Sequence, residues 1–121
     1  MSINIIVQAR MGSQRLPGKM LLDLYGQPII YRILEKLRTC SLVNRVILAI
    51  PDTNMDLILA EVAQQIDGID IVVGSENNLI ERYQLACQKY QSDFVIRFPG
   101  DNVFPDPKQI DELIGFHLAK N

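Results

Sequence analysis

Apolar and polar residues alternate along this chain in blocks that predict strands separated by helices. Short, β-branched apolar runs are typical of buried strands, and they occur at residues 5–7, 46–50, 69–73 and 94–98. In the segments between and after these runs, apolar residues recur at the i, i+3, i+4, i+7 spacing of one buried helix face. The predicted helix faces are Ile30, Ile33, Leu34 and Leu37; Leu59, Val62, Ala63 and Ile66; Leu79, Tyr83, Ala86, Cys87 and Tyr90; and Ile110, Leu113, Ile114 and His117.

Breakers and capping residues set the expected boundaries of these helices. Pro28 suits the first position of the first helix, and residues 52–54 offer Asp, Thr and Asn as N-caps for the second. Asp106 is expected to cap the last helix, with Asp111 on its solvated face. Strands joined by helices of this length pair in parallel with right-handed crossovers. The sequence therefore predicts a single domain over residues 1–121 with an α/β fold, a three-layer α/β/α sandwich on a mainly parallel sheet.

Composition and charge narrow the class of function. An apolar content of 48% with 21% charged residues is ordinary for a soluble globular domain. The formal net charge of −2 argues against general nucleic-acid binding, which needs a basic face. Since we find no secretory signal or apolar membrane span, we expect a cytoplasmic protein without a membrane partner, with Cys40 and Cys87 as reduced thiols. His117 falls on an apolar face and is expected at the edge of the core.

Residues 8–19 carry the strongest chemical signal, and they read Gln-Ala-Arg-Met-Gly-Ser-Gln-Arg-Leu-Pro-Gly-Lys. The segment follows the first strand, and open α/β sheets bind ligands at the carboxyl ends of their strands. Glycine lets backbone N–H groups approach a phosphate, while Arg10, Arg15 and Lys19 add positive charge. The pattern indicates a binding site for the phosphates of a nucleoside triphosphate. The alternative is a solvated surface turn with three unrelated cations.

Two well-known phosphate-binding motifs do not fit this segment. A Walker A loop has four residues between its glycines, followed by Lys and then Ser or Thr. Here five residues separate Gly12 from Gly18, and Lys19 is followed by Met20. The dinucleotide-binding pattern G-x-G-x-x-G does not follow the first strand either. Neither a P-loop NTPase nor a dinucleotide-binding enzyme is supported.

Three stretches of the chain together resemble one enzyme family. They are residues 8–19, Gly-Ser-Glu-x-x-Leu-x-Glu-Arg-Tyr at 74–83, and Arg-Phe-Pro-Gly-Asp at 97–101. In this order they resemble the cytidylyltransferases that make CMP-activated acidic sugars. Within that group they are most similar to the spore-coat polysaccharide biosynthesis F-type proteins, relatives of CMP-KDO and acylneuraminate cytidylyltransferases. The resemblance implies the N-terminal half of a nucleotide-diphospho-sugar transferase-like, Rossmann-like fold.

The resemblance also implies roles for individual residues. Arg10, Arg15 and Lys19 would be catalytic, because they would neutralise the β- and γ-phosphates of CTP. Ser75 would approach the nucleobase, and Arg82 would reach the base or a phosphate. For Arg82 an alternative stays open, an exposed local pair worth only a few tenths of a kcal/mol. The full set of nucleotide-binding residues implied is Ala9, Arg10, Gly12, Ser13, Arg15, Lys19, Ser75 and Arg82.

Asp101 is the predicted metal ligand. It follows the fourth strand after a Pro99-Gly100 break, and carboxylate oxygens suit Mg²⁺. The alternative is an Asx-turn that begins at Asp101. The resemblance favours the metal, because enzymes of the family place a metal-binding aspartate after such a strand. The next residues, Asn102-Val103-Phe104, depart from the Cys-Pro or Glu-Pro of many relatives.

The reaction implied is nucleotidyl transfer with Mg²⁺ as cofactor. A hydroxyl of an acidic sugar, of the ulosonic or nonulosonic type, attacks the α-phosphorus of CTP and pyrophosphate leaves. Enzymes of the family are longer, and their second half supplies much of the sugar pocket. Three alternatives therefore stay open: a cytidylyltransferase of surface polysaccharide synthesis, a nucleotide-binding module without turnover, and a non-catalytic assembly domain. An uncovered apolar face would also favour a homo-oligomer.

Overall fold

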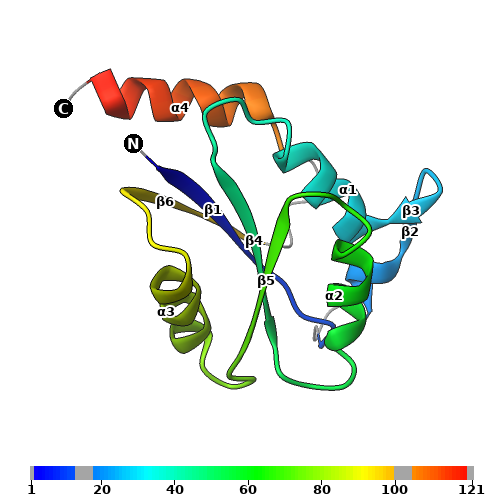
Figure 1. Cartoon of the computed structure of the whole chain (residues 1–121). Coiled ribbons are helices and arrows are strands. Elements are labelled where there is room, and N and C mark those ends of the chain that lie inside the picture. The colour runs from blue at the N-terminus through cyan, green and yellow to red at the C-terminus, as the bar shows by residue number, and fades with distance from the viewer. Residues whose placement is uncertain (1, 13–17, 100–104, 120–121) are drawn as a thin grey trace.

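The computed structural model of the chain describes residues 2–12, 18–99 and 105–119. At its centre lies a parallel sheet with the strand order β5-β4-β1-β6. Helices α1 and α2 cover one face of the sheet and α3 covers the other, so the predicted three-layer α/β/α fold is confirmed (Figure 1). The elements are β1 (Ile3–Gln8), the 3-10 helix η1 (Lys19–Leu21), β2 (Asp23–Leu24), β3 (Gln27–Pro28), α1 (Ile29–Leu37), β4 (Arg45–Pro51), α2 (Leu57–Ala63), β5 (Ile69–Gly74), α3 (Leu79–Lys89), β6 (Phe94–Pro99) and α4 (Pro107–Ala119).

Two apolar clusters hold the three layers together. The larger one lies between the sheet and helices α1 and α2, and Ile33, Leu34 and Leu37 of the predicted helix face are fully buried in it. The smaller one lies between the sheet and α3, where Ile47 and Ala86 are buried. Burying a Leu or Ile side chain contributes about 1.5–3 kcal/mol. The apolar faces predicted for α1 and α2 therefore meet the sheet, whereas Leu79 of α3 and Leu113 of α4, predicted on such faces, are 41% and 63% exposed.

A small hairpin, β2–β3, projects beside α1 and is not predicted by the sequence pattern (Figure 1). Tyr25 and Gly26 form its turn with φ angles of 53° and 90°. The Arg32 guanidinium of α1 donates to the carbonyl oxygens of Leu24 and Tyr25 and so satisfies two turn acceptors. Two-residue strands are too short to show an alternating pattern. Because Pro28 ends β3, it precedes α1 and does not occupy the predicted first helical position.

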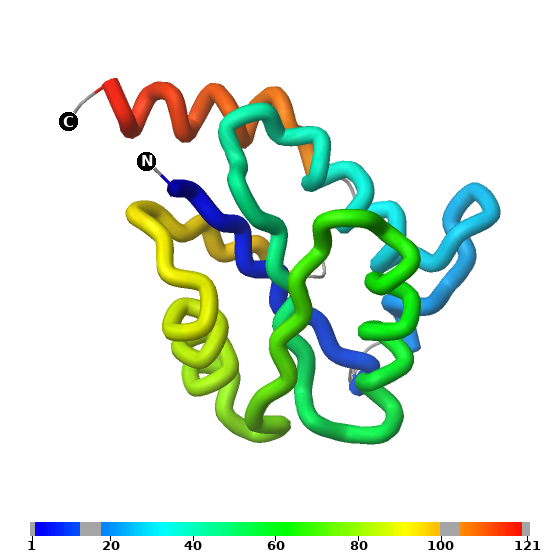
Figure 2. Tube along the Cα trace, viewed as in Figure 1, coloured from blue at the N-terminus to red at the C-terminus, as the bar shows by residue number. Residues whose placement is uncertain are grey.

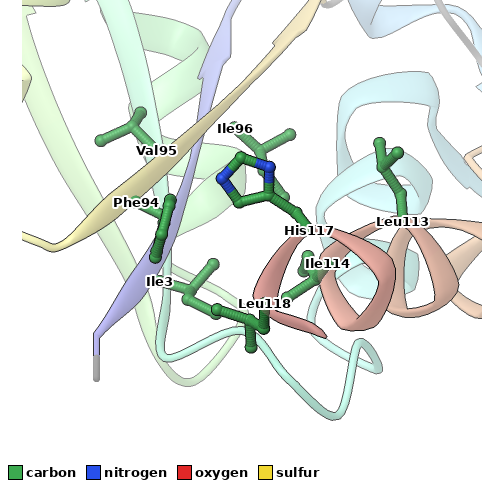
Figure 3. Close-up of a pocket in the computed structure, with 8 residues that line it drawn as sticks. All are labelled: Ile3, Phe94, Val95, Ile96, Leu113, Ile114, His117 and Leu118. Atoms are coloured by element: carbon green, nitrogen blue, oxygen red, sulfur yellow. The ribbon is translucent and has the colours of Figure 1, made fainter. Parts of the chain in front are cut away.

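Helix α4 packs at the amino-terminal edge of the sheet. Asp106 Oδ1 accepts the N–H groups two and three residues further on, so the predicted cap is confirmed. Figure 3 shows the His117 ring beside Phe94, with ring centroids 4.8 Å apart and planes at 85°. His117 therefore packs at the edge of the core, as predicted, and stays exposed on its other side. Ile3 and Leu118 line the same apolar pocket, so the start of β1 and the end of α4 lie side by side (Figure 2).

Cys40 does not show the features of a reactive nucleophile. Cys40 and Cys87 are both free thiols, and Cys40 is buried in the larger cluster. Burial, with a smaller contribution from the nearby Asp111 carboxylate, raises the pKa of Cys40 to about 11. The thiol therefore stays protonated at neutral pH. Among the helices of the described ranges, none combines the length and the apolar content needed to span a membrane.

Asp111 joins α4 to the loop between α1 and β4, which corrects its prediction as part of a solvated face. Its Oδ2 accepts the Ser41 N–H and hydroxyl, and its Oδ1 accepts the Leu42 N–H, each at 2.9 Å. Desolvation by burial acts to raise the pKa of Asp111. The hydrogen bonds from Leu42 and Ser41 outweigh it and hold the pKa below its ordinary value.

We predict that Asp111→Ala lowers the free energy of unfolding by about 1 kcal/mol, because hydrogen bonds to a carboxylate on the surface are lost. The folded-state pKa is depressed, so this contribution is fully present above the unfolded pKa of about 3.9 and is lost as the pH falls through the folded-state value. Urea unfolding at pH 7 and pH 2.5 measures both effects. The neighbouring Glu112→Ala is the control, and an equal loss in both variants would contradict the assignment.

Candidate functional site

The carboxyl ends of the parallel strands meet at one edge of the sheet. The register places Gln8 of β1 beside Ala49 of β4 and Pro99 of β6, and pairs Pro51 with Gly74 at the end of β5. The loops after β1, β4 and β5 gather at this edge, where α/β sheets of this kind bind ligands. A cavity of about 270 Å³ opens there, between the loop after β1 and the start of α3. Its lining residues are Gln8, Ala9, Arg10, Glu76, Asn77, Leu79 and Arg82.

The loop after β1 is anchored by apolar side chains and closed by a hydrogen bond. Met11 and Met20 are buried in the larger core cluster. The Gly18 N–H donates to the Met11 carbonyl at 2.9 Å, which joins the two ends of the loop. Gly18 has a φ of 76°, a left-handed conformation that glycine adopts without a steric cost. Between β1 and this anchored base, the Arg10 side chain is left exposed at the cavity.

Asp56 ties this loop to the start of α2, and sequence reasoning missed it. Its Oδ1 accepts the Met11 N–H and its Oδ2 accepts the Thr53 hydroxyl, both at 2.6 Å, although the residue is only 4% exposed. Thr53 Oγ1 accepts the Asp56 N–H in the turn before α2. The helix begins at Leu57 with Asp56 at the N-cap position, so the prediction that one of residues 52–54 is the N-cap was wrong. The T-x-x-D spacing signals this local turn. The bond to Met11 crosses 45 positions and leaves no local pattern.

Arg82 is buried at the cavity, which excludes the alternative of an exposed local pair. The residue is 3% exposed, and its guanidinium donates to the Ser75 carbonyl at 3.3 Å. Gly74 permits this placement, because a Cβ there would lie 3.0 Å from the Arg82 Cγ. Burial lowers the pKa of Arg82, Asp56 opposes that shift, and the nearby Arg10 adds to it. The two arginines therefore bring two positive charges to this side of the cavity, where Glu76 also lines the wall and the Asp56 carboxylate lies near Arg82.

Ser75 and Asn78 build the first turn of α3 beside the cavity. The Asn78 N–H donates to Ser75 Oγ at 3.2 Å, and Asn78 Oδ1 accepts the Glu81 N–H at 3.0 Å. Ser75 thus supports the helix start with its hydroxyl and holds Arg82 with its carbonyl. Ser75 therefore fixes the position of the Arg82 guanidinium relative to the cavity.

The structure brings together some of the predicted nucleotide-binding residues. Ala9, Arg10 and Arg82 line one cavity, and Ser75 contacts Arg82. Gly12 is exposed, and Lys19 is half-buried in η1; neither is among the residues that line the cavity. The remaining predicted site residues, Ser13, Arg15 and Asp101, lie outside the described residues.

The described residues do not provide a metal site by themselves. Within residues 2–12, 18–99 and 105–119, no group of three His, Cys, Asp or Glu side chains is close enough to hold one ion. Asp56 lies near the cavity, but its two oxygens accept hydrogen bonds from Met11 and Thr53. The prediction that Asp101 binds Mg²⁺ therefore stays a prediction.

Comparison with known proteins gives a consistent result. The model of a family described as cytidylyltransferase matches residues 4–121. The spore coat polysaccharide biosynthesis protein SpsF of Bacillus subtilis is 32% identical over 121 residues, which cover 96% of this chain and 50% of that protein. These matches confirm the family resemblance seen in the sequence.

Solved structures agree in fold. A cytidylyltransferase from Leptospira borgpetersenii serovar Hardjo-bovis superposes with a TM-score of 0.91 at 34% identity, over 98% of this chain and 50% of that one. A CMP:2-keto-3-deoxy-manno-octonic acid synthetase complexed with CTP superposes with a TM-score of 0.83 at 26% identity, over 96% and 47%. The chain therefore spans about half the length of the relatives it matches.

We predict that Asp56→Ala lowers the free energy of unfolding by about 2 kcal/mol, since the buried Met11 N–H loses its acceptor. Urea unfolding measures the loss, and hydrogen exchange should show faster exchange of the Met11 amide. Asp52→Ala, an exposed aspartate of the same loop, is the matched control. If both variants lost equal stability and the Met11 amide kept its protection, the anchoring role would be wrong.

Proposed function

The chain belongs to the cytidylyltransferase family, and we propose that its cavity at the carboxyl edge of the sheet binds CTP. In the whole protein this site would transfer CMP to an acidic sugar of the ulosonic or nonulosonic type. The observation that carries the proposal is the pairing of Arg10 and buried Arg82 around one cavity beside the anchored glycine loop. The structural relative that was solved with CTP supports the choice of nucleotide.

The proposed reaction is an in-line displacement at the α-phosphorus. The sugar hydroxyl oxygen forms a bond to this phosphorus as it loses its proton, and the bond to the bridging oxygen of the β-phosphate breaks. Pyrophosphate leaves with the electron pair of that bond. Proteins accelerate such transfers mainly by positioning the groups and by stabilising the charge that develops on them.

The cationic loop is proposed to hold the leaving group. Arg10, Arg15 and Lys19, with the N–H groups of Gly12 and Ser13, would neutralise the β- and γ-phosphates. Groups that meet developing charge in a fixed position lower the barrier, because they need no rearrangement during the reaction. The anchoring of Met11 by Asp56 supports this proposal, since it fixes the base from which Arg10 projects.

On the nucleoside side, Ala9, Ser75 and Arg82 are the proposed binding residues. Arg82 would contribute its guanidinium directly, while Ser75 holds that guanidinium through its carbonyl. Asp101 remains the proposed Mg²⁺ ligand on the grounds of the family resemblance. Bound there, the ion would stabilise the negative charge on the phosphate oxygens of CTP.

A second candidate function is a CTP-binding module without turnover. It is favoured by the residues that line the cavity, because Arg10 and Arg82 provide positive charge for binding an anion whether or not transfer follows. Two measurements separate the candidates. Calorimetry with CTP and Mg²⁺ reports binding, and pyrophosphate release with a panel of ulosonic and nonulosonic acids reports transfer. Binding with release supports the transferase, binding alone supports the module, and no response in either assay rejects both.

We predict that Arg15→Ala and Lys19→Ala each lower the rate of CMP transfer by about 10²-fold or more, if each cation supplies about 3 kcal/mol of electrostatic stabilisation. Where the chain binds without turnover, each should weaken CTP binding by about tenfold in calorimetry. Arg45→Ala and Lys36→Ala are the matched controls, because Arg45 begins β4 at the opposite edge and Lys36 is exposed on α1. Unchanged rates and affinities in both loop variants would reject these roles.

A further inference from the structure

The Gln8 side chain is an unexplained feature of the cavity. Both of its amide atoms, Oε1 and Nε2, are buried and lack a hydrogen-bond partner among the described residues, and so does the Nε of buried Arg82. Both residues line the same cavity. A buried polar atom without a partner costs about 1–3 kcal/mol, and native proteins leave few of them. Three such atoms at one cavity point to a ligand that pairs with them.

The strand register explains why no neighbouring side chain pairs with Gln8. Its cross-strand partners in the sheet are Ala49 on β4 and Pro99 on β6, and neither side chain carries a hydrogen-bonding group. Asn4 lies on the same face of β1 as Gln8, four positions earlier, and gives a contrast. Its Nδ2 donates to the Tyr90 carbonyl at 3.1 Å, which fixes that amide in the fold, although its Oδ1 also lacks a partner among the described residues. The Gln8 amide, at the cavity end of the strand, is not fixed in this way.

The unpartnered groups match one edge of a pyrimidine base. A glutamine amide offers one acceptor beside two donors, and the Arg82 Nε–H offers one more donor. Cytosine presents a donor at N4 next to acceptors at N3 and O2, which together complement these groups. Uracil presents a donor at N3 between acceptors at O4 and O2. It fits equally well if the Gln8 amide turns by 180°, so that its oxygen accepts from N3 and its amino group donates to O4. Guanine presents an amino group, and adenine a C–H, at the position of O2, so a purine leaves the Arg82 Nε–H unpaired.

We propose that Gln8 is a specificity-determining residue whose amide pairs with the N3 and C4 edge of the pyrimidine base, while Arg82 donates to O2. This inference rests on the proposed function, since it concerns the nucleotide held in the same cavity. Both amide atoms are buried in the structure. Binding therefore requires the Gln8 side chain to rotate about its χ torsions and to turn its amide into the cavity that it already lines. Edge pairing of this kind reads bases in many nucleotide-binding sites.

The test is calorimetry with CTP, UTP, ATP, GTP and inorganic tripolyphosphate, with Mg²⁺, on the wild-type chain and on Gln8→Met. Methionine keeps the length of the side chain and removes the amide. We expect Gln8→Met to weaken CTP and UTP binding by about 10- to 100-fold, to bring their affinities close to those of ATP and GTP, and to leave tripolyphosphate unchanged. Gln84→Met, on the exposed face of α3, is the control.

Thermal unfolding distinguishes recognition from a structural role. Replacing an unpartnered buried amide with an apolar side chain should leave Tm equal or higher, whereas loss of a structural hydrogen bond would lower it. Gln8→Glu is a second variant, which keeps an acceptor but lacks the amino donor, and it should also lose preference for pyrimidines. Equal weakening of CTP and tripolyphosphate, or unchanged CTP affinity, would overturn the proposal for Gln8 alone. A wild-type chain that binds no nucleotide would overturn the proposed function and this inference with it.

Discussion

One buried hydrogen bond, from the Met11 N–H to the Asp56 carboxylate, sets the geometry of the site. A buried charge is costly unless its oxygens are satisfied, and here the loop after β1 and the turn before α2 each satisfy one. Neither segment can move far without leaving the carboxylate unpaired. The loop is thereby held at Met11 to the start of α2, at the edge of the sheet where the cavity opens. The exposed Arg10 side chain therefore projects from a backbone that this hydrogen bond holds in place.

Arg82 imposes the complementary constraint on the other side of the cavity. A buried guanidinium loses hydration, and one carbonyl hydrogen bond at 3.3 Å with a nearby carboxylate compensates for only part of that loss. Arg10 adds a like charge to the same region. The buried Arg82 guanidinium therefore keeps part of its desolvation cost in the structure. An anionic ligand with hydrogen-bond acceptors would relieve it, so stability and binding are coupled at the same residues.

The layer structure could be predicted from the sequence because each strand and helix carries its own period of apolar residues. The β2–β3 hairpin could not, since two-residue strands have no period and their turn is completed by Arg32 from a later helix. For a related reason, the sequence placed Asp111 on a solvated face without its partners, and Asp56 was missed. Each looks like a surface aspartate of a helix or turn, and each accepts a hydrogen bond from a residue 45 or more positions away in the chain. Hydrogen bonds between distant segments leave no trace in a local pattern.

The site itself was predicted in part. Glycine, proline and clustered cations indicate an anion grip, because these residue types have few other reasons to occur together after a buried strand. Arg82 was assigned to the site by resemblance, but its burial follows from the space above Gly74. Gln8 gave no signal at all, since an amide at a strand end is unremarkable until its neighbours are known to be Ala49 and Pro99.

The close packing of Gly74 against Arg82 has a consequence for how this fold can vary. An added methyl at position 74 would meet the Arg82 Cγ at 3.0 Å and its Cα at 3.4 Å, so the Arg82 side chain would have to give by a few tenths of an ångström. The placement of Arg82 at the cavity thus depends on a residue that does not line it. A methyl group in place of one glycine hydrogen would therefore alter the space at the ligand without replacing any residue that lines the cavity.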